Sequence, residues 1–261
     1  MKLKLQIAFW VLIASLYSVA QTPVINQNGV VEGASFTNHI VAGGIASIFG
    51  TNLAPSAFTA NTIPLPTLMN TVQVTLDGNP CPLFFVSPTQ INFQVRWEVL
   101  SLNSTNLIVK VGSLQSNTYA VALSSVAPGM FAVGTQGQGA VLISNTSTFA
   151  APVGSIQGAN SRPVVAGEFV SIFCAGLGDV TNQPADGTAS PSGKNLATVK
   201  GLIQVGIGGN LANPSFAGMA PGFVGLYQVD VQVPSGVSGP ALHVQLSVNA
   251  VQAAFVTIAV Q

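Results

Sequence analysis

The stretch that decides the fold is VAGGIASIFGTNL at residues 41–53, because the chain repeats it as VAGEFVSIFCAGL at residues 165–177. The Val-Ala-Gly and Ser-Ile-Phe triplets and the final leucine recur at identical spacing. An ordered series of such matches across most of the chain indicates two copies of one folding unit. The further matches are QINFQV (90–95) with QVDVQV (228–233), and SLQ (113–115) with AVQ (250–252).

Apolar residues in both copies alternate with polar ones, as they do in half-buried strands. In LHVQLSV at 242–248 every second residue is apolar, which places the apolar side chains on one face of an extended strand. VQVTL at 72–76 and LIVKV at 107–111 follow the same pattern, and Asp77-Gly78 and Gly208-Gly209 supply hairpin turns at matching points. The pattern predicts an all-β chain of two tandem sandwiches of antiparallel sheets.

The repeat also sets the predicted domain boundaries. The first sandwich covers residues 28–125 and the second residues 162–261, each close to the usual size of a β-sandwich domain. Residues 126–161 lie between them as a connector, in which GAVLI at 139–143 has the composition of a strand. We expect this connector to be ordered and to pack, through a strand or a β-hairpin, on one or both sandwiches.

Residues 1–20 have the three-part layout of a secretory signal peptide. Lys2 and Lys4 provide the basic start, residues 5–16 the apolar core, and Ser18-Val19-Ala20 the small residues at the cleavage position. An uncleaved membrane anchor is the alternative, but the apolar core is short for a bilayer span. We therefore expect cleavage after residue 20 and a secreted or extracytoplasmic protein, at the cell surface or in the periplasm, with no membrane span left.

The charge balance bears on the class of partner. Seven Lys plus Arg face seven Asp plus Glu, and cleavage of the signal peptide removes two lysines, which leaves a net charge of minus two. Nucleic acid and anionic membrane surfaces normally require a concentrated basic patch, so this balance argues against both as partners. Disorder is not predicted either, because 48% of the residues are hydrophobic and they gather in strand-like runs.

Several motifs, taken in chain order, resemble a known family. They are VVEGASF (30–36), GIASIFGTNLA (44–54), SPTQINFQV (87–95) followed by Trp97-Glu98, APG (127–129) and APGFVGLYQV (220–229). Together they resemble a secreted bacterial family, the uncharacterised Solibacter-type C-terminal domain, whose halves are similar to the IPT/TIG group of immunoglobulin-like folds. The resemblance implies two immunoglobulin-like domains and an exported location, and it implies no activity. Arg96 departs from the proline that the family pattern has before Trp-Glu.

The residue types that catalysis needs are scarce. Nucleophilic catalysis requires a serine or cysteine beside a base that a third group orients, and His39 and His243 are the only histidines. Neither has a nucleophile motif nearby. The glycines at 206–209 are not followed by a helical pattern, so they indicate a hairpin and not a phosphate-binding loop. We predict a protein that is not an enzyme, with no catalytic residues, no cofactor and no metal.

The carboxylates leave two alternatives open. A hydrolase that uses loop carboxylates is the weaker functional hypothesis, and it requires two acids to converge in one cleft. The second alternative is a calcium ion bound by Asp179 and Asp186, because loop carboxylates are suitable ligands for that ion. No fixed ligand spacing is present. Turn geometry explains Asp77, and a solvated strand end explains Glu98.

Cys81 and Cys174 are the only cysteines, and they fall in different copies. In an oxidising compartment a disulfide between them would link the two sandwiches, provided that their Cα atoms come within about 7 Å. Two buried free thiols are the alternative, because Cys174 continues the apolar run after Phe173.

Four aromatic residues lie near predicted sheet ends: Trp97, Phe85, Phe223 and Tyr227. An exposed pair among them would form a platform for a sugar or a peptide, and core packing is the alternative role.

These observations favour an exported, non-catalytic module that acts through its surfaces, in adhesion, as a scaffold or by binding a ligand. Its partner would be an extracellular protein or a glycan that the sequence does not identify. The alternative is a structural subunit of an extracellular assembly, in which open sheet edges pair with copies of the chain or with a neighbour.

Overall fold

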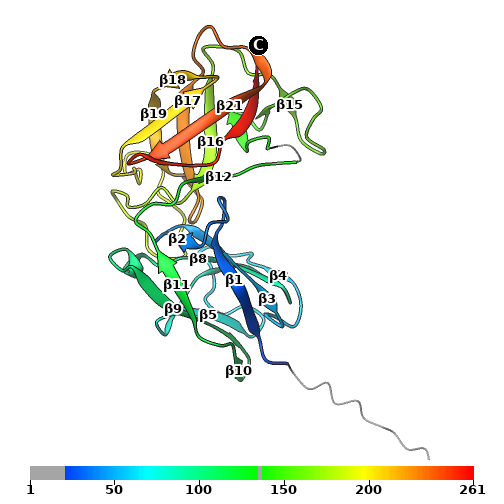
Figure 1. Cartoon of the computed structure of the whole chain (residues 1–261), viewed down its shortest axis with the longest axis vertical. Coiled ribbons are helices and arrows are strands. Elements are labelled where there is room, and N and C mark those ends of the chain that lie inside the picture. Colours follow the sequence, from blue (N-terminus) through cyan, green and yellow to red (C-terminus); the bar gives the residue numbers. More distant parts are fainter. Residues whose placement is uncertain (1–20, 135–136) are drawn as a thin grey trace, which may run out of the picture.

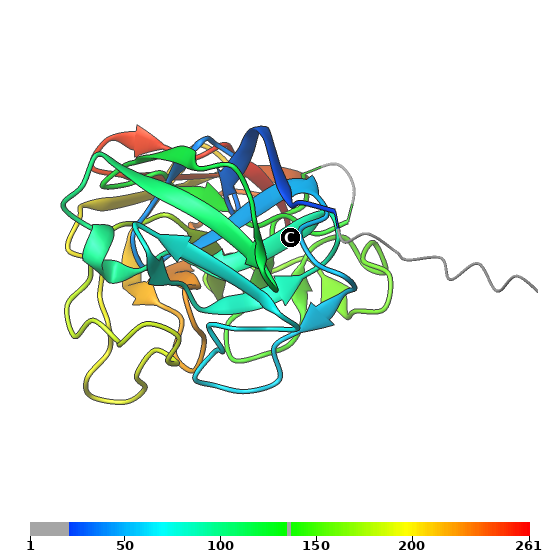
Figure 2. The ribbon, with the colours of Figure 1, turned by 90° about the horizontal axis from the view of Figure 1, so that it is seen from below.

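The computed structural model describes residues 21–134 and 137–261, so the predicted signal peptide lies outside the described residues. The described chain forms two all-β bodies, one after the other along the long axis of the molecule (Figure 1). Figure 2 looks along that axis, with the first body in front of the second. The helical element among the described residues is the short 3₁₀ helix η1 (Trp97–Val99), and no described helix is long and apolar enough to cross a membrane.

The strands of the first body are β1 (Val24–Glu32), β2 (His39–Ile40), β3 (Ile45–Thr51), β4 (Phe58–Thr59), β5 (Val72–Leu76), β6 (Asn79–Pro80), β7 (Leu83–Val86), β8 (Gln90–Gln94), β9 (Ser104–Val111), β10 (Leu114–Gln115) and β11 (Tyr119–Leu123). One sheet has the order β1-β3-β8-β7-β4, and the other has the order β2-β11-β9-β5-β6 with β10 beside β9. If β1, β3, β5, β7, β8, β9 and β11 are named A to G, these are the ABED and CFG sheets of an immunoglobulin-like sandwich.

The strands of the second body are β12 (Gly129–Met130), β13 (Val141–Ile143), β14 (Phe149–Ala150), β15 (Ser161–Arg162), β16 (Phe169–Ala175), β17 (Ile203–Ile207), β18 (Asn210–Ala212), β19 (Pro214–Met219), β20 (Tyr227–Gln232), β21 (Gly239–Val248), β22 (Val251–Gln252) and β23 (Val256–Val260). One sheet runs β15-β14-β13-β16-β20-β19 with β12 on β16, and the other runs β18-β17-β21-β22 with β23 on β21. The same A to G assignment holds, from β13 to β23. The predicted fold of two tandem immunoglobulin-like β-sandwiches is confirmed.

The two sandwiches also match in register. Ser47 of β3 lies opposite Asn92 of β8, and Ser171 of β16 lies opposite Asp230 of β20. The two serines therefore occupy the same position in the same strand pair of each copy. The residues that repeat in the sequence thus repeat in the sheet, which is the outcome expected of a duplicated folding unit.

Both predicted hairpins form two-residue turns. Asp77 and Gly78 join β5 to β6 with φ angles of 45° and 83°, and Gly208 and Gly209 join β17 to β18 with φ angles of 58° and 85°. Two consecutive positive φ angles give the turn the twist that matches paired strands. Glycine adopts this conformation without a steric cost, and aspartate, the first residue of the first turn, is one of the few other residues that adopt it.

The predicted connector joins the second sandwich. Its strands β12 and β13 both pair with β16, and β14 continues that sheet on the other side of β13. The physical reason is that the edge of β16 needs a partner strand. In the first sandwich β1 pairs with the equivalent edge of β3. In the second sandwich the residues ahead of the repeat supply this first strand, β13.

The buried apolar side chains form one continuous cluster that runs from one sandwich into the other. Ile48 and Ile172 are inward-facing residues of the repeated strands, and Trp97 and Leu177 belong to the same cluster. The two cores are therefore in contact through the junction between the bodies.

Candidate functional site

The four aromatic residues predicted as a platform do not share one surface. Trp97 and Tyr227 are buried, Phe85 is half-buried, and only Phe223 is exposed, with 54% of its surface accessible. For Trp97 and Tyr227 the alternative of core packing is correct, and the platform as predicted is not assembled.

Each of the two buried aromatic residues holds a backbone segment of its own sandwich. The hydroxyl of Tyr227 donates a hydrogen bond of 2.5 Å to the carbonyl oxygen of Gly178, at the start of the long loop of the second sandwich. Burial raises the pKa of Tyr227, so this hydroxyl stays protonated. The Trp97 ring lies against Gly43, where any side chain would collide with the indole. A glycine is therefore required at this contact.

Both cysteines are free and buried, each in the core of its own sandwich. Burial raises the pKa of Cys81 to about 12 and also raises the pKa of Cys174. Neutral thiols without access to solvent are unreactive. The predicted candidate disulfide does not form: both thiols are free, and each cysteine is buried among the apolar side chains around it.

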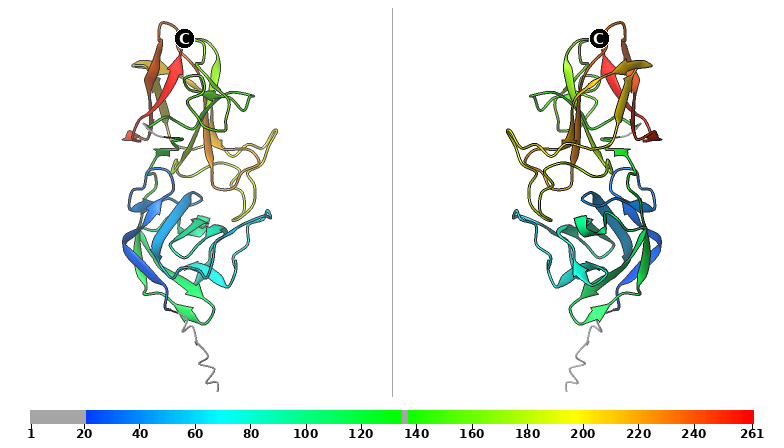
Figure 3. Two further views of the ribbon diagram at one scale, coloured as in Figure 1. Left: turned by 90° about the vertical axis from the view of Figure 1, so that its right-hand side faces the viewer. Right: turned by 90° about the vertical axis from the view of Figure 1, so that its left-hand side faces the viewer.

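A loop of the second sandwich reaches toward the first (Figure 3) and is joined to it by hydrogen bonds. The Gly187 amide donates to Gln94 Oε1 at 2.6 Å, and the Leu65 amide donates to the Gly187 carbonyl at 2.8 Å. The amide of Trp97 donates to Asp186 Oδ1 at 3.1 Å. These three bonds join backbone and side-chain groups of both bodies, so we call residues 183–187 the latch loop.

The loop acids Asp179 and Asp186 form ion pairs with basic side chains. Asp186 lies 3.7 Å from Arg96, which also contacts Glu98 at 2.6 Å, and Asp179 pairs with Lys200 at 2.7 Å. No group of three or more metal-binding side chains occurs in the described ranges. Arg96 thus contacts an acid from each sandwich.

The two histidines lie far apart in the fold. His39 belongs to β2 of the first sandwich and His243 to β21 of the second, and both are exposed. The two histidines therefore do not form a common site.

Glu32 is a buried acid near the junction. Its Oε2 accepts hydrogen bonds from the amides of Ser35 (2.6 Å) and Ala34 (2.9 Å), while Oε1 is buried without a partner among the described residues. Burial raises the pKa of Glu32 above its ordinary value of 4.5. The folded state therefore binds this proton more tightly than the unfolded state, and stability falls as the pH rises from 4.5 through the folded-state pKa.

Glu32→Gln is expected to raise the free energy of unfolding at pH 7 and to leave it nearly unchanged at pH 3.5, where the carboxyl is neutral in both states. Glu168→Gln is the control of opposite sign. The hydrogen bond from Arg162 lowers the pKa of Glu168 to about 2, so its contribution is present above pH 4.5 and is lost as the pH falls toward 2. Urea unfolding at the two pH values measures both effects. Equal pH dependence of the two variants would contradict this assignment.

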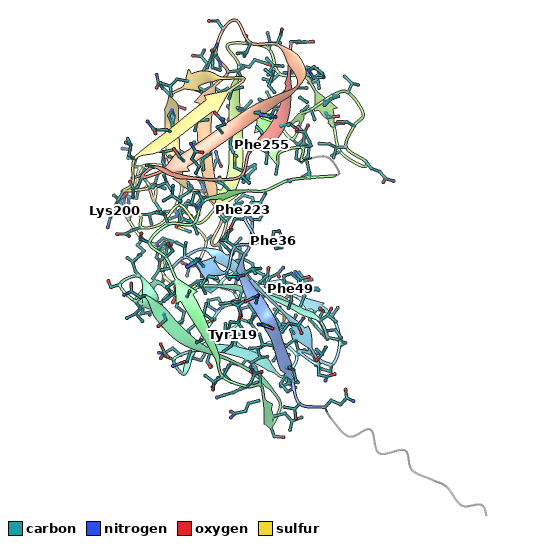
Figure 4. The ribbon with its side chains drawn as sticks, in the orientation of Figure 1. Phe36, Phe49, Tyr119, Lys200, Phe223 and Phe255 are labelled. Carbon is teal, nitrogen blue, oxygen red and sulfur yellow. The ribbon has the colours of Figure 1, made fainter. Side chains whose placement is uncertain are left out.

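An apolar groove of about 520 Å³ lies between the sandwiches. From the first body it is lined by Ile45, residues 60–63, Leu65 and Phe84, and from the second by residues 222–224 and Leu226. Phe223 and Ile63 are exposed there, at 54% and 57% of their surface. Figure 4 shows Phe223 at the junction of the two bodies. No charged residue lines this interdomain groove, which makes it the best candidate functional site.

Comparison with known proteins yields only remote likenesses. No family model matches the chain, and no curated protein matches it. Among solved structures, two plexin A4 extracellular regions are 11% identical and match 97% of this chain, with TM-scores of 0.27 and 0.26. Domains 5–6 of the S-layer protein SbsC are 12% identical, match 92% of this chain and 98% of their own, and have a TM-score of 0.24.

The chain spans only 20% and 17% of the two plexin chains. At these TM-scores the likenesses carry no argument about the site or the function. Strand order and register define the fold, and the interdomain groove and the surfaces beside it are the features that bear on function.

Proposed function

We propose that the chain is an exported, non-catalytic recognition module that binds an extended apolar peptide segment of an extracellular partner in the interdomain groove. The observation that carries this proposal is the groove itself, to which both sandwiches contribute walls and in which Phe223 and Ile63 stay exposed. Large apolar side chains exposed together at a concave site are typical of interaction surfaces. Export is supported by the predicted signal peptide at residues 1–20.

The strand beside the groove supports an extended peptide as the occupant. β4 ends the sheet order β1-β3-β8-β7-β4, and its chain continues directly into residues 60–63, which line the groove. A peptide laid along such an edge can form backbone hydrogen bonds while its alternate side chains enter the groove. Because the lining is uncharged, we expect those side chains to be apolar and uncharged.

The latch loop supports binding at the junction by fixing the distance between the two walls. Leu65, in one wall, is hydrogen-bonded through its amide to Gly187 of the latch loop. A groove whose walls are already in place loses less conformational entropy when a ligand binds, and this preorganisation favours affinity.

The experiment is a binding screen of the mature chain, residues 21–261, against immobilised peptides with alternating aromatic and aliphatic residues. Phe223→Asp and Ile63→Asp are each expected to weaken binding at least about tenfold, because each places a carboxylate in an apolar groove. Val153→Asp is the matched control, since Val153 is 79% exposed and does not line the groove. Unchanged binding of both groove variants, or equal loss in the control, would contradict the proposal.

Self-assembly through sheet edges has less support than peptide binding, because two of the edge strands have features that oppose pairing. The pairing of β1 with β3 shifts register between Ile25 and Val30, and β19 starts at Pro214 with a register shift before Phe216. Irregularities and proline at an edge oppose pairing with another chain.

Membership of the Solibacter-type family stays a prediction from the sequence motifs.

A further inference from the structure

A second concave site lies on the outer face of the second sandwich and shares no lining residue with the interdomain groove. Its floor is the sheet formed by β18, β17, β21 and β22, and its volume is about 400 Å³, within the range of small-ligand sites. The side chains that define it are Gln204, Leu211, Gln245, Ser247, Gln252 and Phe255. We call it the outer-sheet site.

The polar side chains of the outer-sheet site form a row across three strands. Gln204 of β17 lies opposite Ser247 of β21, which in turn lies opposite Gln252 of β22. In the next row Gly206 lies between Leu211 and Gln245. Because Gly206 has no side chain, the sheet is hollow at this point.

An aromatic ring stands at the margin of the site. Phe255, labelled on the second body in Figure 4, is 56% exposed. It stacks on His243, with ring centroids 4.0 Å apart and an angle of 22° between the planes. The stack supports the ring from one side, and Phe255, not His243, lines the site. The free part of the ring therefore offers an apolar, fixed contact surface.

The site is uncharged. Residues 201–261 contain a single Asp, Glu, Lys or Arg, and that residue, Asp230, belongs to β20 in the other sheet. The available groups are amides and a hydroxyl, which both donate and accept hydrogen bonds. The described hydrogen bonds include none from the side chains of Gln204, Gln245 or Gln252, so these amides are available to a ligand.

We propose that the outer-sheet site binds a neutral oligosaccharide. Sugar hydroxyls match a row of amides and hydroxyls that donate and accept, and the C–H face of a pyranose matches an aromatic ring. A charged ligand finds no opposite charge in the site, and a purely apolar one would leave three amides without partners. This site is separate from the peptide-binding groove and extends the proposed function.

The first copy provides a natural comparison. Gln73, Lys110 and Gln115 occupy the register positions of Gln204, Ser247 and Gln252. Lysine in place of serine adds a long, charged side chain at the centre of the row. We therefore expect the oligosaccharide to bind the second sandwich and not the first.

Saturation-transfer NMR with the mature chain tests the proposal. The probes are neutral hexasaccharides of β-1,4-linked glucose, mannose and xylose, with an acidic oligogalacturonide as the charged comparison. At least one neutral probe is expected to bind. Phe255→Ala and Ser247→Lys are each expected to weaken it about tenfold, and Gln115→Ala in the first copy should leave it unchanged.

Three outcomes would overturn the proposal: no neutral probe binds at millimolar concentration, the acidic probe binds equally well, or Phe255→Ala and Ser247→Lys bind as the parent chain does. Phe223→Asp separates the two sites, because it should reduce peptide binding while oligosaccharide binding stays unchanged. Phe255 is more than half exposed, so its substitution leaves the core intact, and the thermal midpoint of each variant checks this directly.

Discussion

Gly43→Ala is expected to destabilise the protein by about 3 kcal/mol, because it combines a backbone cost with overpacking. Gly43 has a φ of 75°, which costs an alanine about 1 kcal/mol. The added methyl group would also collide with the ring of Trp97, which is buried and held at its backbone by Asp186. Denaturant unfolding followed by tryptophan fluorescence measures the loss, since Trp97 is the only tryptophan after residue 20.

Gly167→Ala is the matched control in the second copy. Gly167 occupies the same register position, since its amide bonds to the Val233 carbonyl as the Gly43 amide bonds to Val95. Its φ is 92°, but no atom lies within 4 Å of an added methyl group. Only the backbone cost of about 1 kcal/mol is expected. Equal losses in the two variants would show that the Trp97 ring moves aside at little cost.

The duplicated fold could be predicted because the repeated residues determine register locally. Strand alternation assigns each side chain to one face, and a shift of one residue would expose the whole apolar face of a strand. Ser47 and Ser171 therefore had to occupy equivalent places. The position of the connector could not be predicted in this way, because the pairing of β13 with β16 is a contact between segments whose patterns suit either sandwich.

The junction could not be located from periodicity, although the two copies differ visibly there. Where the first copy has Arg96-Trp97-Glu98, the second has Pro234-Ser235-Gly236. Pro234 stands at the position that corresponds to Arg96, and Arg96 and Trp97 of the first copy contact the latch loop. The difference between the two copies at these equivalent positions was the sequence signal that indicated the interdomain contact.

The sequence pattern indicates neither the interdomain groove nor the outer-sheet site, for two different reasons. Residues 60–65 have no strand alternation, and their role depends on the loop at 222–226, which is distant in sequence. The outer-sheet site is built from glutamines that alternation marks only as solvent-facing. Of the predicted aromatic residues only Phe223 lines the interdomain groove, because sheet-end aromatic residues serve both cores and surfaces.

Gln94→Ala is expected to destabilise the protein by about 2 to 3 kcal/mol, since it removes buried hydrogen bonds and leaves a small cavity. The Gln94 side chain is fully buried, where Oε1 accepts from the Gly187 amide at 2.6 Å and Nε2 donates to the Gly43 carbonyl at 3.3 Å. Without it the Gly187 amide is left unpaired, and we also expect faster proteolytic cleavage of the latch loop. Urea unfolding and limited proteolysis measure the two effects.

Gln232→Ala separates the interdomain bond from the bond within one sandwich. Gln232 Nε2 donates to the Gly167 carbonyl at 2.8 Å, which repeats the Gln94 bond to Gly43, but Gln232 is exposed and has no bond to the other body. A loss below about 0.5 kcal/mol is expected. A comparable loss in both variants would place the stabilisation inside each sandwich. If only Gln94→Ala lowers the free energy of unfolding substantially, the latch loop holds the two walls of the groove in place. Gln94→Ala should then also weaken peptide binding, although Gln94 does not line the groove.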